Sequence, residues 1–258
     1  MRLSKWRRSS SDMWLERSEL LIGKKSIEFL KNCTVVIVGV GGVGGYAAEM
    51  IVRAGVGTIV IIDADVVSAS NKNRQLLALD STIGMSKVTV LSDRLLDINP
   101  NLNVIAVKEY LTEENVEKVM EEALQGRKPD FVVDAIDTLS PKISLISYCF
   151  SNSIPLVSSM GSGAKFDATK VRIADISKSY NCPLAYILRK KLRKVGISKG
   201  FKVVFSEELP EKEAIIPTEG ERNKKSQVGT ISYLPAVFGC VCAQAALTYL
   251  IDKSNAVG

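Results

Sequence analysis

The sequence predicts an α/β protein built on a doubly wound, mostly parallel sheet. Three observations support this prediction: short apolar runs rich in β-branched residues, helical patterns between them, and a glycine-rich turn directly after the first run. Short runs that are apolar throughout are typical of parallel strands, which are buried on both faces. Their alternation with helices is the pattern of a doubly wound sheet.

The first half of the chain follows this pattern element by element. Residues 13–30 place apolar side chains among charges at helical spacing, and residues 34–38 are a β-branched run that ends at the glycine-rich turn. A helix over 46–54 is closed by Gly55, and a second strand over 58–62 ends at Asp63. We then expect a helix at 85–98, a strand at 103–107 and a helix at 113–123.

The second half continues the alternation and then becomes less regular. We expect a strand at 131–133, a helix at 139–150 and a strand at 154–158, followed by strands at 170–176 and 201–205 around a basic helix at 184–195. Residues 207–227 are rich in charge, proline and glycine, which predicts a mobile loop. We interpret residues 1–258 as one domain, with a nucleotide-binding part over 14–160 and a substrate-binding and dimerisation part over 161–258.

The turn after the first strand has the spacing of a phosphate-binding loop. Gly39, Gly41 and Gly44 form a Gly-x-Gly-x-x-Gly pattern, with Gly42 as an additional glycine. Glycines let the backbone approach a phosphate closely, and the N-terminus of the following helix favours its negative charge. Asp63 ends the next strand about 20 residues later, where a carboxylate can bond ribose hydroxyls. On this evidence alone the ligand is a nucleotide, with NAD as the default.

A cluster of polar residues downstream favours ATP over NAD. All but one lie in the segment that connects the second strand to the next predicted helix, and the last lies at the start of that helix. They are Asp65, Asn71, Asn73, Arg74 and Lys87. The two cations, Arg74 and Lys87, suit a triphosphate better than the two phosphates of a dinucleotide.

One further carboxylate suggests a metal ion. Asp137 lies just beyond the end of a later strand, at the edge where doubly wound sheets bind ligands. A carboxylate at that place suits Mg²⁺, which prefers oxygen ligands. We therefore predict ATP and Mg²⁺ as cofactors, with Asp137 as the metal ligand.

The composition excludes several kinds of chemistry. The chain has no histidine, so Ser-His-Asp and Cys-His catalysis and any zinc site with an imidazole ligand are ruled out. None of the five cysteines forms a C-x-x-C pair, so a structural zinc knuckle has no obvious ligands. Their odd number and scattered positions are typical of reduced thiols in a cytosol-like compartment.

Taken together, the motifs resemble those of the ThiF/MoeB/HesA superfamily, the adenylating relatives of ubiquitin-activating enzymes. The resemblance rests on residues 39–44, Asp63-x-Asp65, Asn71-x-Asn73-Arg74-Gln75, Gly84-x-x-Lys87, Ile98-Asn99-Pro100 and Asp134-Ala-Ile-Asp137. It implies a Rossmann-like, ThiF/MoeB-type adenylation fold, with Arg74, Lys87 and Asp137 in catalysis. The superfamily's N-terminal helix carries an arginine that reaches the partner subunit's ATP site. Arg17 matches it, which implies a homodimer.

A second group of residues resembles one branch of that superfamily, the tRNA threonylcarbamoyladenosine dehydratases. The matching segments are residues 161–169, Asp175-Ile176, Pro183-Leu184-Ala185, Leu188-Arg189, Lys199-Gly200 and Phe205-Ser206. This branch uses ATP to activate the carboxylate of threonylcarbamoyladenosine beside the tRNA anticodon, and the side chain then cyclises with loss of water. The ThiF and MoeB types carry two C-x-x-C pairs, which this chain lacks.

Two other functions stay open at this point. The branch often has an acid where Cys182 stands, and protein-activating relatives can carry a thioester-forming cysteine on a nearby loop. The alternative is therefore an activating enzyme for a ubiquitin-like or sulfur-carrier protein. A third hypothesis, an NAD-dependent oxidoreductase or a catalytically silent nucleotide-binding scaffold, is disfavoured by Arg74, Lys87 and Asp137.

The charge pattern suggests a polyanionic partner. The net charge is +6, and the densest basic run lies on and just after the predicted helix at 184–195. Its members are Arg189, Lys190, Lys191, Arg193, Lys194 and Lys199, with Arg7, Arg8, Arg222, Lys224 and Lys225 as additional cations. Contacts of such residues with phosphates are salt-sensitive and independent of sequence. We expect tRNA as the partner, sulfur-relay proteins as further candidates, and no stable binding of DNA.

An uncharged segment near the C-terminus bears on localisation. Residues 228–251 are long enough to cross a bilayer. Pro235, Gln244 and many small residues favour instead a helix buried between the sheet and a partner subunit. Residues 1–11 have no apolar core, so they do not form a secretory signal. We expect a cytoplasmic protein, with organelle or membrane-surface association as the alternative.

Overall fold

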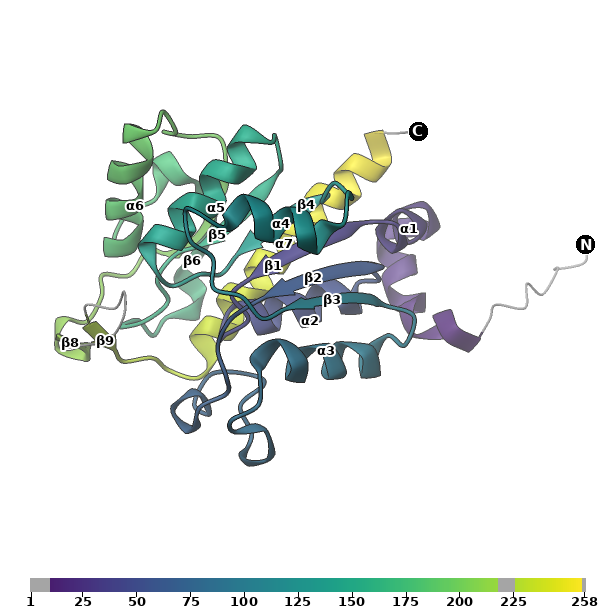
Figure 1. Cartoon of the computed structure of the whole chain (residues 1–258), viewed down its shortest axis with the longest axis horizontal. Coiled ribbons are helices and arrows are strands. Elements are labelled where there is room, and N and C mark those ends of the chain that lie inside the picture. The colour runs from purple at the N-terminus through teal and green to yellow at the C-terminus, as the bar shows by residue number, and fades with distance from the viewer. Residues whose placement is uncertain (1–9, 218–225, 257–258) are drawn as a thin grey trace, which may run out of the picture.

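A seven-stranded sheet forms the centre of the computed structural model, which describes residues 10–217 and 226–256 (Figure 1). In chain order the strands are β1 (Thr34–Val38), β2 (Thr58–Ile62), β3 (Asn103–Val107), β4 (Phe131–Asp134), β5 (Leu156–Ser159), β6 (Val171–Asp175) and β7 (Lys202–Ser206). Their order in the sheet is β3-β2-β1-β4-β5-β7-β6, and every pairing is parallel except that of β6 with β7. The expected doubly wound, mostly parallel sheet is confirmed.

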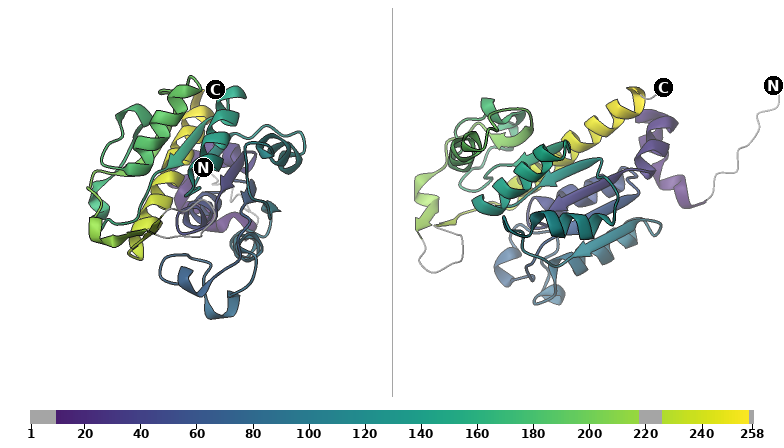
Figure 2. Two further views of the ribbon diagram at one scale, coloured as in Figure 1. Left: turned by 60° about the vertical axis from the view of Figure 1, so that its left-hand side comes forward. Right: turned by 45° about the horizontal axis from the view of Figure 1, so that its top comes forward.

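Helices cover both faces of this sheet (Figures 1 and 2). They are α1 (Glu16–Lys31), α2 (Gly44–Arg53), α3 (Lys87–Ile98), α4 (Val116–Leu124), α5 (Leu139–Ser151), α6 (Pro183–Lys194) and α7 (Tyr233–Ala256). Short 3₁₀ helices are η1 (Ser10–Leu15), η2 (Ala69–Asn71), η3 (Asp80–Thr82), η4 (Ala168–Lys170), η5 (Ile176–Lys178) and η6 (Lys212–Ala214).

Alternate residues of each strand feed two separate cores. In β1, Val35 and Ile37 pack with α1, α2, α3 and α7, whereas Val36 and Val38 pack with α4, α5 and α6. Because successive side chains of a strand point to opposite faces, a run that is apolar throughout is required to fill both cores. The result is a three-layer arrangement of helices, sheet and helices.

The strand order reverses between β1 and β4. β1 is followed in the sheet by β2 and β3 on one side and by β4 and β5 on the other. In open α/β sheets the ligand crevice lies at the carboxyl ends of the strands at this switch point. The glycine-rich turn after β1 and the segment after β4 both lie there, so the topology brings the predicted nucleotide-binding residues to one edge.

Helix α7 holds the uncharged C-terminal segment in the core. Among the described helices it is the one long and apolar enough to cross a membrane, and 44% of that apolar window is buried. It packs against α1, α2 and four strands of the sheet, which confirms the expected burial against the sheet. It begins at Tyr233 rather than at residue 228 because Ser226–Val228 form strand β9.

The segment expected to be a loop, 207–227, contains regular structure. β8 (Ile215–Pro217) pairs antiparallel with β9 (Ser226–Val228), and Gly229 N–H donates to the carbonyl of Ala214 at 2.8 Å. The composition gave no sign of this pair because its strands have three residues each and hardly alternate in polarity. Residues 218–225 lie outside the described part of the chain, and the mobility of the segment stays a prediction.

Candidate functional site

The turn after β1 packs so closely that two of its positions require glycine. Gly39 has φ of +84° and donates its N–H to the carbonyl of Ile62 at 2.8 Å. A Cβ on Gly39 would come within 2.8 Å of the carbonyl oxygen of Ala135, and one on Gly44 within 1.8 Å of the Gly39 carbonyl oxygen. The backbone therefore turns sharply between β1 and the first residue of α2, and the N-terminus of a helix at such a turn favours an anion.

The middle of this turn is a cradle beside unpaired polar atoms. A Cβ on Gly42 would contact Pro235 at 3.2 Å and Arg74 at 3.4 Å. The amide of Gln75 lies next to Gly41, and its Oε1 is buried with no hydrogen-bond partner among the described residues. Ser86 Oγ, directly before Lys87, is buried and unpaired in the same sense. Buried polar atoms without partners are costly, so the Gln75 amide beside Gly41 indicates a place for a polar ligand.

Asp63 joins the glycine turn after β1 to the segment after β2 through hydrogen bonds. Its Oδ2 accepts from the N–H of Val40 at 2.8 Å, and its Oδ1 accepts from the N–H of Asp65 at 2.8 Å. A carboxylate has further lone pairs beyond these two bonds, so the predicted contact with ribose hydroxyls remains open to Asp63.

Lys87 holds a buried positive charge at the first residue of α3. Its ammonium lies 2.7 Å from Asp65 Oδ2, and the two side chains are 6% and 68% exposed. Its N–H also donates to the carbonyl of Asp65 at 3.1 Å. The lysine is thus fixed while the carboxylate that neutralises it is open to solvent.

Asn73 and Arg74 are fixed together beside Gly42. Arg74 Nη1 donates to Asn73 Oδ1 at 2.9 Å and to the carbonyl of Ser70 at 3.1 Å, while Asn73 Nδ2 donates to the carbonyl of Thr230 at 3.0 Å. Asn71 has a local role, because its Oδ1 accepts from the N–H of Ser68 at 3.1 Å. The guanidinium is therefore positioned next to the phosphate-binding turn.

Asp137 is an exposed carboxylate just beyond β4, two residues after the Ala135 that backs Gly39. Within the described ranges no three Asp, Glu or Cys side chains converge on one point. Mg²⁺ is commonly held by one or two carboxylates together with substrate phosphates and water. The donor set present here fits a magnesium ion that enters with ATP.

Comparison with known proteins agrees with this geometry. The family model described as ThiF family matches residues 15–257. The chain belongs to the ThiF family.

Its relatives also place it in one branch of the ThiF family. It is 50% identical over 194 residues to the tRNA threonylcarbamoyladenosine dehydratase of Bacillus subtilis, covering 75% of this chain and 74% of that protein. It is 34% identical to the enzyme of the same name from Escherichia coli, over 96% of this chain and 98% of that one. A crystal structure of the Escherichia coli dehydratase, TcdA, in complex with ATP matches with a TM-score of 0.85 and 33% identity, covering 97% and 100% of the two chains. The chain belongs to this dehydratase branch.

Arg17 is the one predicted catalytic residue that this ThiF-family chain does not bring to its own crevice. Arg17 is exposed on α1. Leu15, two residues earlier, packs against Gly55, which lies beyond the C-terminal end of α2. The glycine turn lies at the N-terminal end of α2, about 15 Å away for a helix of ten residues. Arg17 is therefore available to a second chain rather than to the crevice of its own chain.

The predicted tRNA-binding residues lie on and after α6, away from the glycine turn. Lys190, Lys191, Arg193, Lys194 and Lys199 are exposed. Arg189 is half-buried, because its Nη1 donates to the carbonyl of Ser179 at 2.7 Å. Arg7, Arg8, Arg222, Lys224 and Lys225 lie outside the described residues.

Sequence reasoning missed a buried ion pair below the site. Asp134 and Lys142 are fully buried with 2.7 Å between Oδ2 and Nζ, and Ser158 Oγ donates to the same carboxylate oxygen at 2.6 Å. Asp134 Oδ1 also accepts from the N–H of Ile136 at 3.1 Å, which shapes the turn that leads to Asp137. Lys142 looks like an ordinary helix lysine in the sequence, so no local signal could have paired it with Asp134.

Of the five cysteines, three are deeply buried, Cys182 lies at the edge of a cavity, and Cys240 is exposed on α7. Burial raises the pKa of Cys33 and of Cys242 to about 12, and it also raises the pKa of Cys149. Such thiols are protonated at neutral pH and do not act as nucleophiles. Cys182 is also buried but stands at the N-cap of α6 and lines a pocket.

Proposed function

We propose that this chain is an ATP-dependent tRNA threonylcarbamoyladenosine dehydratase, which adenylates the carboxylate of threonylcarbamoyladenosine beside the anticodon and cyclises it with loss of water. The observation that carries the proposal is a glycine cradle flanked by Arg74, Lys87 and Asp137 in a chain that matches a dehydratase crystallised with ATP over nearly its whole length. Fold likeness alone would not support it, because one fold hosts many activities.

The first step suits a site without histidine. The substrate's carboxylate is ionised at neutral pH, so its oxygen attacks the α-phosphorus of ATP without a general base, and pyrophosphate leaves. The protein has to position the reactants and neutralise charge. Arg74 and Lys87 supply that charge, the turn from Gly39 to Gly44 supplies backbone N–H groups, and Asp63 orients the ribose.

The second step needs little from the protein. A nitrogen or oxygen of the same nucleoside attacks the activated carbonyl carbon, the ring closes and AMP leaves with the former carboxylate oxygen. The net change in the nucleoside is the loss of one water. An intramolecular attack of this kind has a high effective concentration, so positioning contributes most of the acceleration.

Asp137 is the residue proposed to hold Mg²⁺. A magnesium ion bound there would neutralise phosphate charge. The exposure of Asp137 beside the turn after β1 supports this assignment.

Nucleoside mass spectrometry tests the proposed function. Purified protein, ATP, Mg²⁺ and tRNA that carries threonylcarbamoyladenosine should yield a nucleoside lighter by one water, with AMP and pyrophosphate formed in equal amounts. Omitting ATP should abolish the product. Calorimetry should also show NAD binding at least about a hundredfold weaker than ATP, a difference of about 2.7 kcal/mol. Tight NAD binding without ATP binding would contradict this function and support the NAD-dependent oxidoreductase.

The alternative, activation of a ubiquitin-like or sulfur-carrier protein through Cys182, makes an opposite prediction for one variant. Ring closure within the nucleoside uses no enzyme nucleophile, so Cys182→Ser should retain most ATP-dependent cyclisation of tRNA. A thioester route would lose all transfer in the same variant. Cys182 is only 5% exposed, which favours the direct route. Complete loss of cyclisation in folded Cys182→Ser protein would instead support the covalent mechanism.

The proposed function also implies binding partners and a cellular location. We propose a homodimer in which Arg17 serves the partner's nucleotide site, with tRNA as the substrate and sulfur-relay proteins as further partners. DNA is not expected to bind stably. A tRNA substrate and reduced thiols are consistent with the cytoplasm, and membrane-surface or organelle association remains the alternative.

A further inference from the structure

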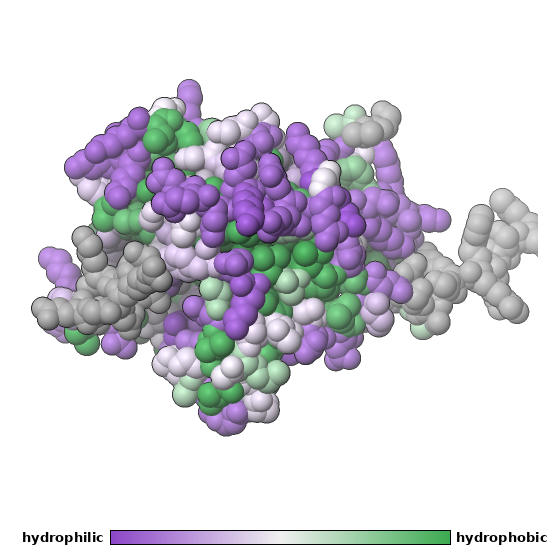
Figure 3. Space-filling model, in the orientation of Figure 1, coloured by the Kyte–Doolittle hydropathy of each residue, from purple (hydrophilic) through white to green (hydrophobic). Residues whose placement is uncertain are grey.

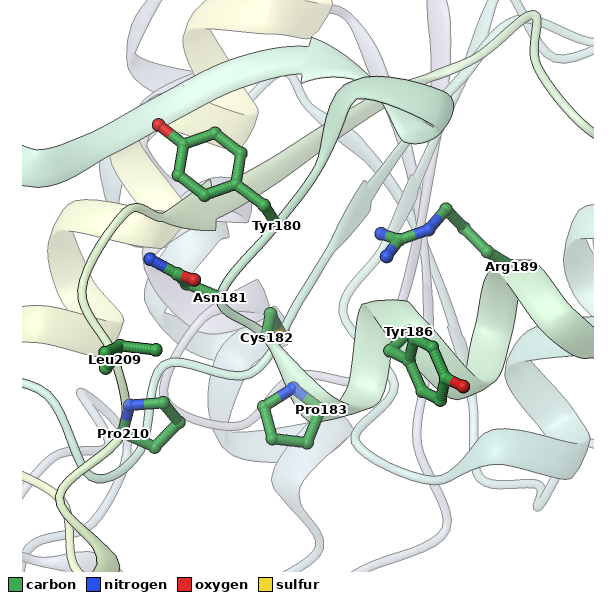
Figure 4. Close-up of a pocket in the computed structure, with 8 residues that line it drawn as sticks. All are labelled: Tyr180, Asn181, Cys182, Pro183, Tyr186, Arg189, Leu209 and Pro210. Atoms are coloured by element: carbon green, nitrogen blue, oxygen red, sulfur yellow. The ribbon is translucent and has the colours of Figure 1, made fainter.

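A pocket of about 360 Å³ lies at the N-terminal end of α6, apart from the residues of the glycine cradle (Figure 4). Its wall combines two tyrosines and an arginine with small or apolar side chains: Tyr180, Asn181, Cys182, Pro183, Tyr186, Arg189, Leu209 and Pro210. In Figure 4, Leu209 and Pro210 stand on one side and Tyr186 and Arg189 on the other, with Cys182 and Pro183 between them. The adenylation chemistry uses none of these residues.

A buried lysine fixes the back of this pocket. Lys165 is 3% exposed, and its ammonium donates to the carbonyls of Asn181 at 3.2 Å and Ser206 at 3.0 Å. Asn181 has φ of +51° and donates from Nδ2 to the carbonyl of Glu207 at 2.7 Å. The chain before α6 is thus tied to the end of β7 in a conformation that few residues adopt.

Three flat side chains line this frame: Tyr180 and Arg189 are held by contacts, and Tyr186 is open to solvent. The ring of Tyr180 packs edge-to-face on Phe205 with 5.3 Å between centroids, and it remains 46% exposed. Tyr186 is 62% exposed, and Arg189 is fixed by its bond to the Ser179 carbonyl. Exposed aromatic rings and guanidinium planes are the surfaces on which unpaired RNA bases stack.

A strip of positive charge continues from the pocket along α6. Tyr186, Lys190, Arg193 and Lys194 are spaced four, three and one residues apart, which places them on one face of the helix. Ala185, Leu188 and Leu192 bury the opposite face, and α6 contains no acidic residue. From Tyr186 to Lys194, eight residues further on, the helix rises about 12 Å. Hydrophilic side chains gather over this part of the molecule in Figure 3.

One short segment connects the surroundings of Lys165 with the nucleotide site. Ala164, beside Lys165, donates its N–H to the carbonyl of Gly229 at 2.8 Å. One residue further along, the carbonyl of Thr230 accepts from Asn73 Nδ2. The link between β9 and α7 therefore contacts both the residue before Lys165 and Asn73 of the nucleotide site.

We propose that this pocket binds one unpaired nucleobase of the RNA substrate, stacked on Tyr186, while Lys190, Arg193 and Lys194 contact the phosphates of adjacent nucleotides. The inference deepens the proposed function and rests on it, because RNA is the substrate there. Charge complementarity favours RNA over a peptide as the occupant, since five cations lie within residues 189–194 of one helix.

Tyr186→Ala is the direct test, with Ile187→Ala as its matched control on the same helix. The dissociation constant of an anticodon stem-loop RNA at fixed salt should rise about 5- to 150-fold in Tyr186→Ala, the range expected for losing one stacked base worth about 1–3 kcal/mol. Ile187→Ala should bind the RNA as the wild type does, and Tyr186→Trp should restore binding. The affinity for ATP should be the same in all three variants.

RNAs that lack one base show whether the pocket binds the modified adenosine itself or a neighbouring base. Removing the base that stacks on Tyr186 should weaken binding to the wild type and add no further loss in Tyr186→Ala, as a double-mutant cycle requires. Such coupling at the modified adenosine identifies the substrate base, whereas coupling at a neighbouring position identifies a flanking base. Lys190→Ala should reduce the salt dependence of binding, which Tyr186→Ala should leave unchanged.

Each contrary result has a distinct meaning. Unchanged RNA affinity in Tyr186→Ala, or no coupled abasic position, overturns the inference while wild-type conversion of tRNA still supports the proposed function. A Tyr186→Ala defect confined to a carrier protein with a free C-terminus overturns it in favour of a peptide occupant. If the wild type neither binds nor converts tRNA, the proposed function itself fails.

Discussion

Glu49 is a buried carboxylate that ties α2, the helix after the glycine turn, to α3. It accepts hydrogen bonds from Arg53 at 2.9 Å and from Arg94 at 2.6 Å, and it is 7% exposed while both arginines are about half exposed. Burial raises the pKa of Glu49, but the hydrogen bonds and charges of Arg94 and Arg53 outweigh burial and hold it below its ordinary value. The charged form is therefore favoured in the folded state.

Glu49→Gln should lower the free energy of unfolding by about 1–3 kcal/mol at pH 7, since two charge-assisted hydrogen bonds are weakened. A group whose pKa is lowered on folding stabilises the protein above its unfolded pKa, near 4.3, and loses that contribution as the pH falls through its folded pKa. Denaturant unfolding should show the gap between wild type and variant closing below about pH 4. The exposed Glu28, paired with Lys31, offers a control, because Glu28→Gln should change stability by less than about 1 kcal/mol. A gap that does not change with pH would contradict this account.

Asp137→Ala should abolish turnover without altering the fold, because it removes an exposed carboxylate and no core contact. We expect at least a hundredfold loss of cyclised nucleoside, about 2.7 kcal/mol in the barrier, with an unchanged thermal unfolding transition. Asp97→Ala is the matched control, since Asp97 is a similarly exposed acid on α3, outside the lobe that holds Arg74. Near-normal activity in Asp137→Ala would show that another group holds the metal ion.

At the scale of elements, the glycine turn and α2 act as one unit. A Cβ at position 44 would lie 1.8 Å from the Gly39 carbonyl oxygen, so alanine there must displace backbone. At position 45 a Cβ would be 3.5 Å from the Val40 carbonyl oxygen, an ordinary contact. The two adjacent glycines therefore differ sharply in what they tolerate.

Gly44→Ala should destabilise the protein by about 3 kcal/mol or more and prevent ATP binding, because the turn cannot close around the added methyl. Gly45→Ala, in a helix where alanine is preferred, should leave both stability and ATP affinity within about 1 kcal/mol of the wild type. Calorimetric unfolding and ATP titration of the pair check this. Equal ATP affinities in the two variants would show that the turn does not form the cradle.

The elements that the sequence predicted well are those specified by local pattern. β1, β2 and β3 have the bounds expected from their apolar runs, and the polar residues at their ends lie at the switch point as the topology requires. Helix starts were less certain: α3 begins at Lys87 rather than at residue 85, because Ser86 is still extended. What could not be predicted depends on contacts between distant segments, such as the β8–β9 pair, the pairing of Asp134 with Lys142, and the pocket formed around Tyr180 and Tyr186.

At the scale of the whole molecule, two groups of exposed apolar side chains lie beside residues predicted to act in catalysis. One lies on η1 and α1 and flanks Arg17: Met13, Trp14, Leu20 and Leu21, of which the two leucines are 89% and 85% exposed. The other lies on the lobe of residues 66–86 that holds Arg74, where Val66, Leu79, Ile83 and Met85 are exposed; Figure 3 shows apolar residues on this lobe. Exposed apolar surface of this extent is typical of a protein interface.

A two-fold axis that sets α1 of one chain against the lobe of the other would cover both surfaces at once. The interface of such a dimer is self-complementary, so each chain contributes α1 to its partner and receives the partner's α1 at its own lobe. Arg17 would then lie beside Arg74 and Lys87 of the other chain. This arrangement explains why Arg17 is remote from the crevice of its own chain.

The dimer predicts complementation between two inactive variants. Arg17→Ala and Asp137→Ala should each be inactive, but in a mixed dimer one site has Asp137 from the Arg17→Ala chain and Arg17 from the Asp137→Ala chain. Random re-association of equal amounts gives mixed dimers in about half of the molecules with one intact site each, so activity should return to about a quarter of the wild-type level. Leu20→Glu should give a monomer by light scattering and lose activity with its fold intact. A monomeric wild type at micromolar concentration, or no recovery in the mixture, would show that Arg17 does not act across a subunit boundary.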